Sequence, residues 1–489
     1  MSPLFLVIDA GSGGAKAFIV DEHGRISAEA QLPWDRSTWT PNLGWDSISR
    51  AVRDVLHSGN VDPGLIGAVG VTSMREEFIL LDHQGSWVRV DAGESSREYG
   101  ERLLCDYGAR MYDASGHWPV PNWIAGSLLP WLRSERPEEL TKVKHFFMVA
   151  DWVAYRLTGR AATDGSNACE SALYDIVRRG WAWSLIEELG VPTDIFPEPF
   201  DSGDQVGALT ADASRNTGVP EGTPVVLGGA DTQCGLLGMA VGSGEAGAVG
   251  GTTTPVQALT ERPVLDPDRR LWTGCHVRRG LWVLESNAGF TGRAVGWLKD
   301  WTGSGGDYAR LNDEAAAVPP GSNGLLSFLG PHVFNSGPPY WEHDRLGDVD
   351  ALPVILGKHD FTFGELARSI LEANCFAVKA NLEQITRVCG ASFNYLKFCG
   401  GNAKSSLWMQ IQADVLGVPI ILPEVLDGTA VGVGVLATVG SGHYRDIDEA
   451  LRAMVKLRKP IRPDPMNHEK YCRLYERWLS VRSRVPRTL

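Results

Sequence analysis

The stretch that decides the fold is LFLVIDAGSGGAKAFIVD, residues 4–21. An apolar run ends at Asp9, a glycine-rich turn follows, and a second apolar run then begins, which predicts a β-hairpin. Gly11, Gly13 and Gly14 free the backbone to take positive φ and to bring several N–H groups against one anion. Asp9 is placed to organise a cation beside that anion. The alternative is an ordinary glycine-rich hairpin that ends in a solvated aspartate.

This hairpin differs from the two common nucleotide-binding turns. A P-loop and a Rossmann turn both need a helix directly after the glycines, and the P-loop also needs Gly-Lys-Ser/Thr. Here Lys16, Phe18 and Val20 alternate with Ala15, Ala17 and Ile19 instead. That alternation predicts a strand after the turn.

A second segment repeats the pattern in the other half of the chain. Residues 245–260, EAGAVGGTTTPVQALT, predict a strand, a glycine-threonine turn and a strand. Alone, this too could be a plain hairpin. Two glycine-hydroxyl hairpins, each opening one half of the chain, are typical of a duplicated phosphate-binding fold. The repeat therefore favours phosphate binding over two ordinary hairpins.

The composition predicts a large acidic globular protein. A chain of 489 residues is too long for one core, and we expect two large domains. Apolar residues make up 43% and charged residues 21% of the chain, so it can bury a substantial core. A net charge of -13 argues against non-specific binding to nucleic acid or to an anionic membrane.

The cysteines and the N-terminus bear on the compartment. The eight cysteines show no C-x-x-C spacing and no His-rich surroundings, which excludes a zinc site and a disulfide framework. Reduced thiols and a cytoplasmic location are the expectation. The first apolar run stops at Asp9, and nowhere do 18 uncharged apolar residues follow one another. We therefore expect neither export nor a membrane span.

Short apolar runs alternate with helical stretches from residue 1 to about 240, which is α/β patterning. Phe363–Glu383 has apolar residues at helical spacing and predicts a core helix without chemistry of its own. Residues 395–440 predict strand, helix, strand and a last helix rich in small residues. That last helix could approach a neighbour or a ligand closely.

Asp231 is a candidate for chemistry. In VVLGGADTQCGLLGMA, residues 225–240, it follows a predicted strand and stands at the mouth of a helix. One reading makes it an N-cap that accepts backbone N–H groups. The other uses its place at the carboxyl end of a strand, where ligands of α/β domains usually bind. There it could accept the proton of a substrate hydroxyl that attacks a γ-phosphoryl group.

Two further segments carry polar chemistry. In VTSMREEFILLD, residues 71–82, Arg75 and Glu76 interrupt two apolar runs. They could be the polar tip of a hairpin, or a guanidinium-carboxylate pair that binds a polyhydroxylated ligand. In CGGNAKSSLW, a predicted strand-turn-helix, Gly400 and Gly401 could let a flat ring approach the backbone.

Together these motifs resemble those of the FGGY carbohydrate kinases over nearly the whole chain. The first phosphate motif of the family, Asp-x-Gly-Thr/Ser followed by a basic residue, is similar to DAGSGGAK, and the second, Gly-Thr-Ser/Thr, is similar to GTT. GGADTQCGLLG resembles the segment of the catalytic aspartate. NAGFTGRAVGWLKD and FCGGNAKSSLWMQIQADVLGVPI resemble the segments around the nucleotide.

The resemblance assigns roles to these positions. It implies that Asp231 is the general base, that Asp9 serves Mg²⁺, and that Arg75, Glu76, Asp231 and Thr232 bind the substrate. It further implies a nucleotide site made of Gly11, Ser12, Gly13, Lys16, Gly251, Thr252, Thr253, Gly292, Gly400, Gly401 and Ser405.

The implied fold is α/β, the actin-like, hexokinase-like pair of ribonuclease H-like domains with ATP and Mg²⁺ in the cleft between them. We place the N-terminal domain at residues 1–242 and the C-terminal domain at 243–489. Homodimers are common in the family, so a homodimer is compatible with the resemblance.

Within the family, SMREE, DWVAYRLTG, TDGSNA and VDAGESSRE look most like the autoinducer-2 kinases, and the general frame also resembles xylulokinases. The resemblance thus implies transfer of the γ-phosphate to a hydroxyl of a small, five-carbon sugar or keto-polyol. Arg75 and Glu76 also echo the glycerol kinases, so a polyol acceptor stays open.

Two segments depart from the family pattern. VDAGESSRE replaces the usual Trp-x-Asp-x-Arg, and NSGPPYWEHD replaces the expected Gly-Glu-Arg. Both flank the substrate or the domain interface, so they bear on the identity of the acceptor. A different class, a nucleotide-dependent binding or regulatory protein, shares the fold but needs neither a carboxylate base nor Arg75 and Glu76.

Overall fold

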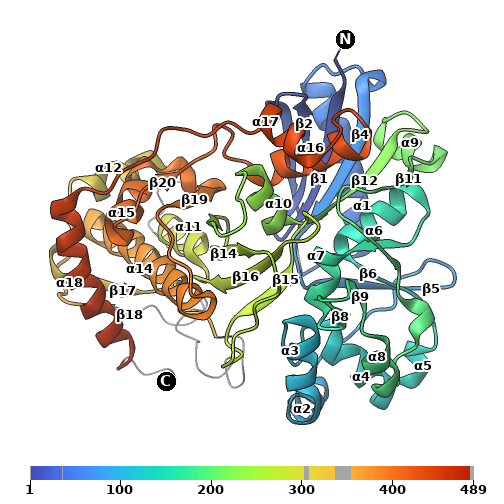
Figure 1. The fold of residues 1–489 in the computed structure, drawn as a ribbon, viewed down its shortest axis with the longest axis horizontal. Coiled ribbons are helices and arrows are strands. Elements are labelled where there is room, and N and C mark those ends of the chain that lie inside the picture. The colour runs from blue at the N-terminus through green and yellow to red at the C-terminus, as the bar shows by residue number, and fades with distance from the viewer. Residues whose placement is uncertain (1, 36, 302–307, 336–353, 485–489) are drawn as a thin grey trace.

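The computed structural model describes residues 2–35, 37–301, 308–335 and 354–484, and contains two six-stranded sheets, one in each half of the chain (Figure 1). The first sheet has the order β11 (Gln205–Ala208), β12 (Pro224–Ala230), β4 (Ile66–Ser73), β1 (Leu4–Gly11), β2 (Gly14–Asp21), β3 (Ile26–Pro33). The second has the order β15 (Trp272–Cys275), β16 (Trp282–Asn287), β14 (Pro255–Thr260), β13 (Ala246–Val249), β19 (Leu396–Cys399), β20 (Ile420–Ile421).

The two sheets share one pattern of strand pairing. β1 and β2 form an antiparallel hairpin, and β1 pairs in parallel with β4 on its other side. β13 and β14 form the equivalent hairpin, and β13 pairs in parallel with β19. Both predicted hairpins are therefore confirmed, and the pairing agrees with a duplicated fold.

Helices cover both faces of the first sheet because its strands carry apolar side chains on both sides. Leu6 and Ile8 pack towards α1 (Pro41–Ser58) and α6 (Val149–Thr158), while Val7, between them, packs with residues of α16 (Gly428–Gly440). α9 (Ala211–Thr217) lies beside α1, and α17 (Ile447–Met454) lies beside α16. Figure 1 shows α16 and α17, late in the chain, against the strands of the first half.

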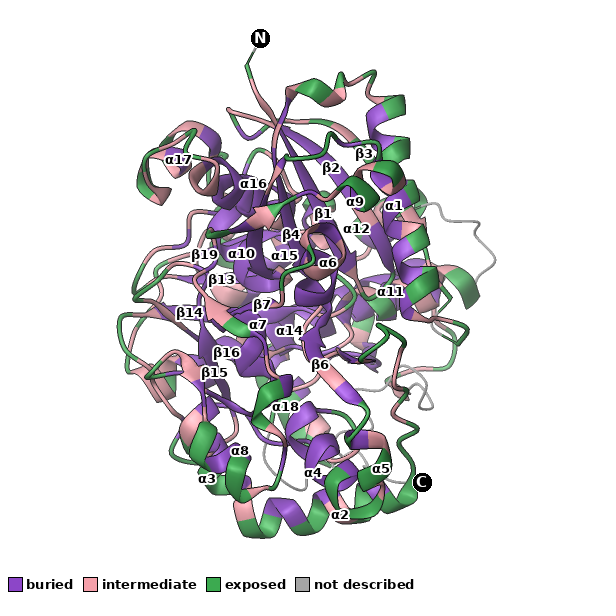
Figure 2. Ribbon diagram, turned by 90° about the vertical axis from the view of Figure 1, so that its right-hand side faces the viewer, coloured by how far each residue is buried: buried purple, intermediate pink, exposed green. Residues whose placement is uncertain are grey.

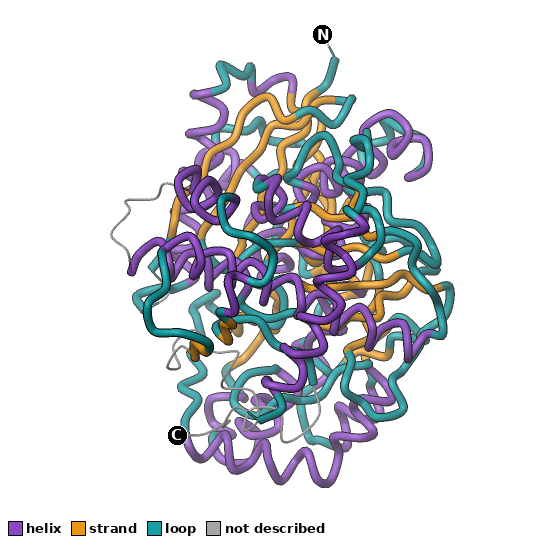
Figure 3. The backbone as a smooth tube through the Cα atoms, turned by 90° about the vertical axis from the view of Figure 1, so that its left-hand side faces the viewer, coloured by secondary structure: helices purple, strands orange, loops and turns teal. Residues whose placement is uncertain are grey.

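The core of the second half is built around α14 (Phe363–Cys389). The predicted helix ended at Glu383, but the observed one continues until Gly390, where φ is 68°. A capping box between Thr362 and Glu365 starts it. Further helices contribute buried side chains to this core: α11 (Thr291–Trp301), α12 (Tyr308–Ala316), α15 (Ser406–Leu416) and α18 (Pro465–Arg482). Figure 3 shows the helices on this side of the molecule.

Two helices run between the sheets in close contact. α10 (Asp231–Gly238) packs against the second sheet through Leu236, and its backbone lies against α16. A Cβ on Gly432 of α16 would lie 1.9 Å from the carbonyl oxygen of Cys234. The predicted close approach of this small-residue helix is therefore confirmed, and the neighbour is α10.

Most of the remaining elements form an outer region of the first half of the chain. In the second half, β17 and β18 form a two-stranded sheet. Figure 2 shows the outer helices exposing one face and burying the other. β4 and β5 (Phe78–Asp82) lie in different sheets, so residues 74–77 are not the tip of a hairpin. The other elements are α2 (Glu94–Leu103), α3 (Ala109–Ser115), α4 (Ala125–Glu135), α5 (Pro137–Leu140), β6 (Val143–Met148), β7 (Ala162–Asp164), α7 (Gly165–Ala168), β8 (Tyr174–Asp175), β9 (Gly180–Trp181), α8 (Trp183–Glu188), β10 (Glu198–Phe200), β17 (Leu326–Phe328) and β18 (Val354–Leu356).

No helix in the described part of the chain is both long enough and apolar enough to cross a membrane. All eight cysteines are free thiols. Of the two segments that depart from the family pattern, VDAGESSRE lies at the start of α2, whereas NSGPPYWEHD lies outside the described residues after Asn335.

Candidate active site

Strand register brings the two candidate aspartates to one edge of the first sheet. Ala10 of β1, Ser73 of β4 and Ala230 of β12 form one row across three parallel strands. Asp9 precedes this row and Asp231 follows it. Because parallel strands share their carboxyl edge, both carboxylates stand where α/β folds bind ligands.

Hydrogen bonds from two other segments fix the backbone just before Asp231. The Thr72 hydroxyl donates to the carbonyl of Gly229 at 2.6 Å, and the backbone N–H of Ala230 donates to Ser166 Oγ at 2.9 Å. Asp164 holds Ser166 in turn by accepting its backbone N–H at 2.8 Å. The strand end that carries Asp231 is thus held in one geometry.

Asp231 is the first residue of α10, and Ala230 is the N-cap. Its Oδ1 accepts the backbone N–H of Thr232 at 2.7 Å. Burial raises the pKa of Asp231 to about 7, with Arg75 opposing the shift and Asp9 adding to it. A carboxyl whose pKa lies near neutrality is suited to act as a base at that pH.

Asp9 has the features of a cation ligand. The residue is only 7% exposed, and its Oδ1 has no hydrogen-bond partner among the described residues. Lys16 stands directly opposite it on β2. Burial raises the pKa of Asp9, while Lys16 lowers it and Asp427 adds to the rise. An orphaned carboxylate oxygen in such a place fits a hard divalent cation.

The first hairpin presents its turn to solvent. Ser12 and Gly13 are exposed, and Gly11 is half-buried. Gly14 has φ of 153°, and a Cβ there would lie 2.3 Å from the carbonyl of Leu32. Gly11 and Gly13 do not have positive φ, so the prediction of left-handed backbone at those two positions is wrong. Only Gly14, the first residue of β2, adopts a positive φ.

The second hairpin is similar and supports a further segment. Gly251 and Thr252 are exposed at its turn, and the N–H of Gly251 donates to the Thr253 carbonyl at 2.9 Å. The Thr252 carbonyl accepts the N–H of Gly292 at 3.2 Å. A Cβ on Gly292 would lie 2.0 Å from the Gly251 carbonyl, which explains why glycine occupies the start of α11.

The segment after β19 also lies against this hairpin. Gly400 has φ of 90°, and a Cβ there would lie 2.4 Å from the carbonyl of Gly250, while a Cβ on Gly401 would lie 4.0 Å from the same oxygen. The side chain of Asn402 donates to Thr254 Oγ1 at 3.4 Å. Ser405 is the N-cap of α15, and its Oγ accepts the N–H of Trp408 at 3.1 Å. The predicted nucleotide residues of the second half are thus neighbours, and Ser405 also has a structural role.

The guanidinium of Arg75 belongs to a buried ion-pair network. Its guanidinium donates to both carboxylate oxygens of Glu285 at 2.6 and 2.7 Å and to Glu170 at 3.2 Å. Its side chain is only 7% exposed. Glu285 belongs to β16 of the second sheet, so this buried ion pair joins the two halves of the protein. From the sequence we paired Arg75 with Glu76. Its observed partners, Glu170 and Glu285, were not predicted.

The ion pair belongs to a longer buried network. His117 Nε2 lies 3.3 Å from Glu170, and although burial opposes it, Glu170 raises the pKa of His117 to about 9. On the other side, Gln257 Nε2 donates to Glu285 at 2.6 Å and to Thr232 Oγ1 at 3.3 Å. The network therefore ends at the residue beside Asp231.

Glu76 and Thr232 complete the predicted acceptor residues. Glu76 has φ of 69°, and burial raises its pKa to about 8 although Arg75 opposes the shift. Its carboxyl makes no hydrogen bond with the described residues. The Thr232 hydroxyl donates to Gln233 Oε1 at 2.7 Å. We call residues 74–78 the acceptor loop.

Comparison with known proteins identifies the family. Residues 4–238 match the N-terminal domain and residues 246–441 the C-terminal domain of the FGGY family of carbohydrate kinases. The chain belongs to this family. An autoinducer-2 kinase from Enterobacter sp. (strain 638) is 31% identical over 97% of this chain and 93% of its own length. One from Yersinia enterocolitica is also 31% identical with the same coverage.

Solved structures of FGGY kinases share the fold. A xylulose kinase from Lactobacillus acidophilus superimposes with a TM-score of 0.84 at 18% identity, covering 99% of this chain and 98% of that one. A xylulose kinase from Rhodospirillum rubrum gives 0.79 at 24% identity and covers 99% of both. The protein therefore has the two-domain actin-like fold of FGGY kinases and is an ATP-dependent carbohydrate kinase.

Proposed function

We propose that this kinase transfers the γ-phosphate of ATP to a hydroxyl of a small, five-carbon sugar or keto-polyol, with Asp231 as the general base. The observation that carries the proposal is the position of Asp231 at the carboxyl edge of the first sheet, beside the strand that carries Asp9, with a pKa raised to about 7. The identity to autoinducer-2 kinases over 97% of the chain supports a short keto-polyol acceptor.

In this mechanism the acceptor hydroxyl gives its proton to the Asp231 carboxylate as its oxygen attacks the γ-phosphorus. The new bond joins that oxygen to phosphorus, and the bond from phosphorus to the β-phosphate oxygen breaks, releasing ADP. Backbone amides at the two exposed turns, at Ser12, Gly13 and Thr252, would neutralise charge on the transferred group. The base contributes about 100- to 10,000-fold in rate.

Asp9 would hold Mg²⁺, directly or through water, because its Oδ1 is buried and unpartnered. When bound, the ion supplies positive charge to the phosphate oxygens. Lys16, opposite Asp9, adds a second positive charge at the same edge. Gly292, Gly400, Gly401 and Ser405 would line the site of the nucleoside.

In the acceptor site we propose that Glu76 and Thr232 contact the substrate, and that Arg75 orients this loop from its ion pairs with Glu170 and Glu285. Three of its five N–H groups are used in those bonds, which leaves the others for an acceptor hydroxyl. A glycerol or other polyol kinase of the same family is the second candidate, because a triol fits the same donors and acceptors.

The test is a panel of D-xylulose, glycerol and the autoinducer, with ADP formation and the phosphorylated product both measured. Wild type should phosphorylate a five-carbon acceptor best, and Asp231→Asn should lose at least about 100-fold in turnover. Asp194→Asn removes an exposed carboxylate and serves as the matched control. Unchanged turnover in Asp231→Asn would remove it as the base, and binding of ATP without any product would favour a regulatory protein.

We further propose that the boundary between the two domains lies between residues 242 and 243. Residues 428–454 belong to the second half of the sequence but pack on the first sheet. We also propose a cytoplasmic location, which the free thiols support. A homodimer is the proposed oligomeric state, and light scattering would test it.

A further inference from the structure

Gln257 of β14 stands on the face of the second sheet that packs against α10. Its directly paired residue on β16 is Glu285, and Leu259 and Val283 form the next pair on the same face. Leu259 and Val283 pack with Leu236 of α10. Because the side chains of a strand alternate between its two faces, Gln257 and Glu285 share this face with the apolar pair. An apolar pair is thus followed by a polar pair on the same surface.

Both polar side chains are buried, although apolar side chains could fill the same space. Gln257 is 0% exposed and Glu285 is 2% exposed. Glu285 has its partner in Arg75, but Gln257 Oε1 has no hydrogen-bond partner among the described residues. A buried amide oxygen without a partner costs stability. Packing alone therefore does not explain a glutamine at this position.

The carboxylate of Glu285 decides how the amide of Gln257 is turned. Gln257 Nε2 lies 2.6 Å from Glu285 Oε2, and only the nitrogen of the amide can donate a hydrogen bond to a carboxylate. A flipped amide would bring two oxygens together. The second N–H of Nε2 is thereby directed to Thr232 Oγ1 at 3.3 Å. A pair of residues in the second sheet thus sets a contact with the residue after Asp231.

This contact fixes the hydrogen bonding of the Thr232 hydroxyl. A hydroxyl has one hydrogen to donate and two lone pairs that can accept. Thr232 donates its hydrogen to Gln233 Oε1 at 2.7 Å, and one lone pair accepts the N–H of Gln257. The remaining lone pair is free to accept a hydrogen bond from a hydroxyl of the acceptor.

We propose that Gln257 is a positioning residue of the acceptor site. It holds Thr232 so that the threonine oxygen accepts one hydroxyl of the substrate while Asp231 takes the proton of another. The inference rests on the proposed kinase function and adds a residue of the second half to the site. Gln257 acts through Thr232 and does not touch the substrate, since its own side chain is fully buried.

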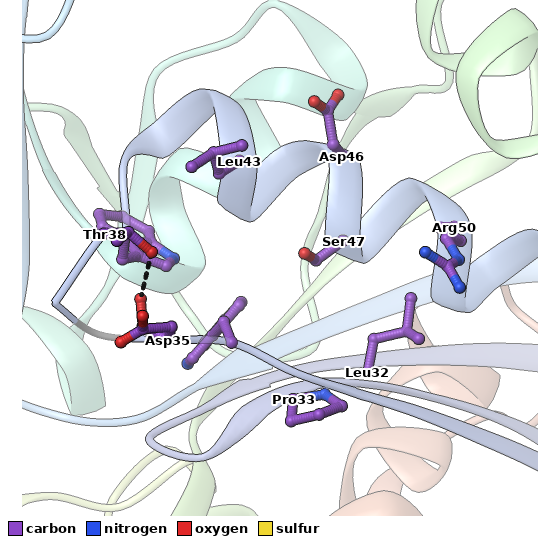
Figure 4. A pocket seen from close by; sticks show the side chains of 10 residues that line it. Leu32, Pro33, Asp35, Thr38, Leu43, Asp46, Ser47 and Arg50 are labelled. Atoms are coloured by element: carbon purple, nitrogen blue, oxygen red, sulfur yellow. Dashed lines mark hydrogen bonds between the residues drawn. The ribbon is translucent and has the colours of Figure 1, made fainter.

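An open hollow of the first half lies apart from this contact. It measures about 310 Å³ and lies between α1 and the end of β3, where Figure 4 shows Leu43 and Asp46 on the helix and Pro33 on the strand. Its lining includes none of the proposed acceptor residues. The hollow therefore supplies a control for the experiment.

The test is a double-mutant cycle, measured with the best acceptor among D-xylulose, glycerol and the autoinducer. Gln257→Met keeps the volume of the side chain and removes its donor. Its kcat/KM for the acceptor should fall about tenfold, mainly through KM, while KM for ATP stays within about twofold. Thr232→Val should cause a similar fall. Because Gln257 acts through the Thr232 hydroxyl, adding Gln257→Met to Thr232→Val should lower kcat/KM by less than about twofold more.

Three further variants complete the design. Gln412→Met, in α15, removes another fully buried glutamine whose Oε1 lacks a partner among the described residues. Gln412 donates to the Cys375 carbonyl at 3.4 Å. This variant and Asp46→Asn, in the hollow, should leave KM for acceptor and for ATP unchanged. Thr232→Ser keeps the hydroxyl and should remain sensitive to Gln257→Met.

Two results would overturn the positioning role and leave the kinase function standing. One is a pair of losses that multiply in the double variant, or a rise in KM for ATP as large as that for the acceptor, because Gln257 would then only support the second hairpin. The other is a larger change in acceptor KM from Asp46→Asn than from Gln257→Met, which would place the acceptor in the hollow. If wild type phosphorylates no acceptor, the proposed function fails and the inference fails with it.

Discussion

Asp231 combines burial with the charge of the catalytic base that we propose. Burial raises the pKa of its carboxyl to about 7, so only part of the protein carries the ionised base at neutral pH. We predict that kcat/KM rises between pH 6 and pH 8 with a midpoint near 7, because the deprotonated form is the active one. A profile measured with saturating ATP that is flat, or that falls across this range, would contradict the role of base.

The same shift predicts how stability depends on pH. The pKa of Asp231 is about 7 in the folded state against 3.8 for the free side chain, so folding favours the protonated form. Its contribution is fully present below about pH 4 and is lost as pH rises through 7. Asp231→Asn should therefore increase the free energy of unfolding at pH 8 by up to about 4 kcal/mol and so raise the melting temperature. At pH 4 the substitution should have little effect. Thermal unfolding at pH 4 and pH 8 measures this effect. A lower melting temperature for the variant than for wild type at pH 8 would disprove the prediction.

Arg75 compensates two buried carboxylates at once. Arg75→Met removes the guanidinium from Glu285 and leaves Glu170 with His117 alone, and should cost about 3 to 5 kcal/mol in the free energy of unfolding. Arg110→Met removes an exposed pair with Glu188 and should cost less than about 1 kcal/mol. Urea titration measures both, and equal losses would show that the buried network has no special weight.

At the scale of elements, the contact between α10 and α16 has no room for a side chain. Gly432→Ala would place a Cβ 1.9 Å from the Cys234 carbonyl, so the helices must separate. We predict a loss of about 1 to 3 kcal/mol in stability and lower turnover, because α10 begins with Asp231. Gly296→Ala, in α11, has nothing within 4 Å and should be neutral or stabilising. A Gly432→Ala protein with wild-type stability would refute the tight contact.

The elements that the sequence predicted well are those with local signals. Glycine-rich turns between alternating apolar runs predicted both hairpins, and the helical spacing of apolar residues predicted α14. Backbone angles within the first turn were less predictable, because only Gly14 has a positive φ and Gly11 and Gly13 do not. Glycine permits such a conformation without requiring it.

Contacts between distant elements could not be predicted from local patterns. Arg75 pairs with Glu170 and Glu285, which lie 95 and 210 residues away along the chain. Nothing near either glutamate marks it as a partner, because tertiary packing brings the loop after β4, the turn at 169–171 and β16 together. The neighbouring Glu76 was therefore the natural but incomplete choice. The acceptor loop was also expected as a possible hairpin tip, whereas β4 and β5 join different sheets.

At the scale of the whole molecule, the proposed active site lies where the two halves meet. The Arg75–Glu285 pair crosses between the sheets, and the Trp282 indole N–H donates to the Ile176 carbonyl at 2.9 Å across the same boundary. Helices α10 and α16 fill the space between the sheets. Movement of one half on the other would thus act directly on Asp231, and closure around ATP would exclude water from the reaction.

The most direct test of the account is a crystal structure with a non-hydrolysable ATP analogue, Mg²⁺ and a phosphorylatable acceptor. We predict the reacting hydroxyl within about 3.2 Å of an Asp231 carboxylate oxygen and in line with the γ-phosphorus, with the metal on the side of Asp9. An acceptor hydroxyl that contacts Glu76 instead, with Asp231 out of hydrogen-bond reach of the acceptor, would contradict the central claim.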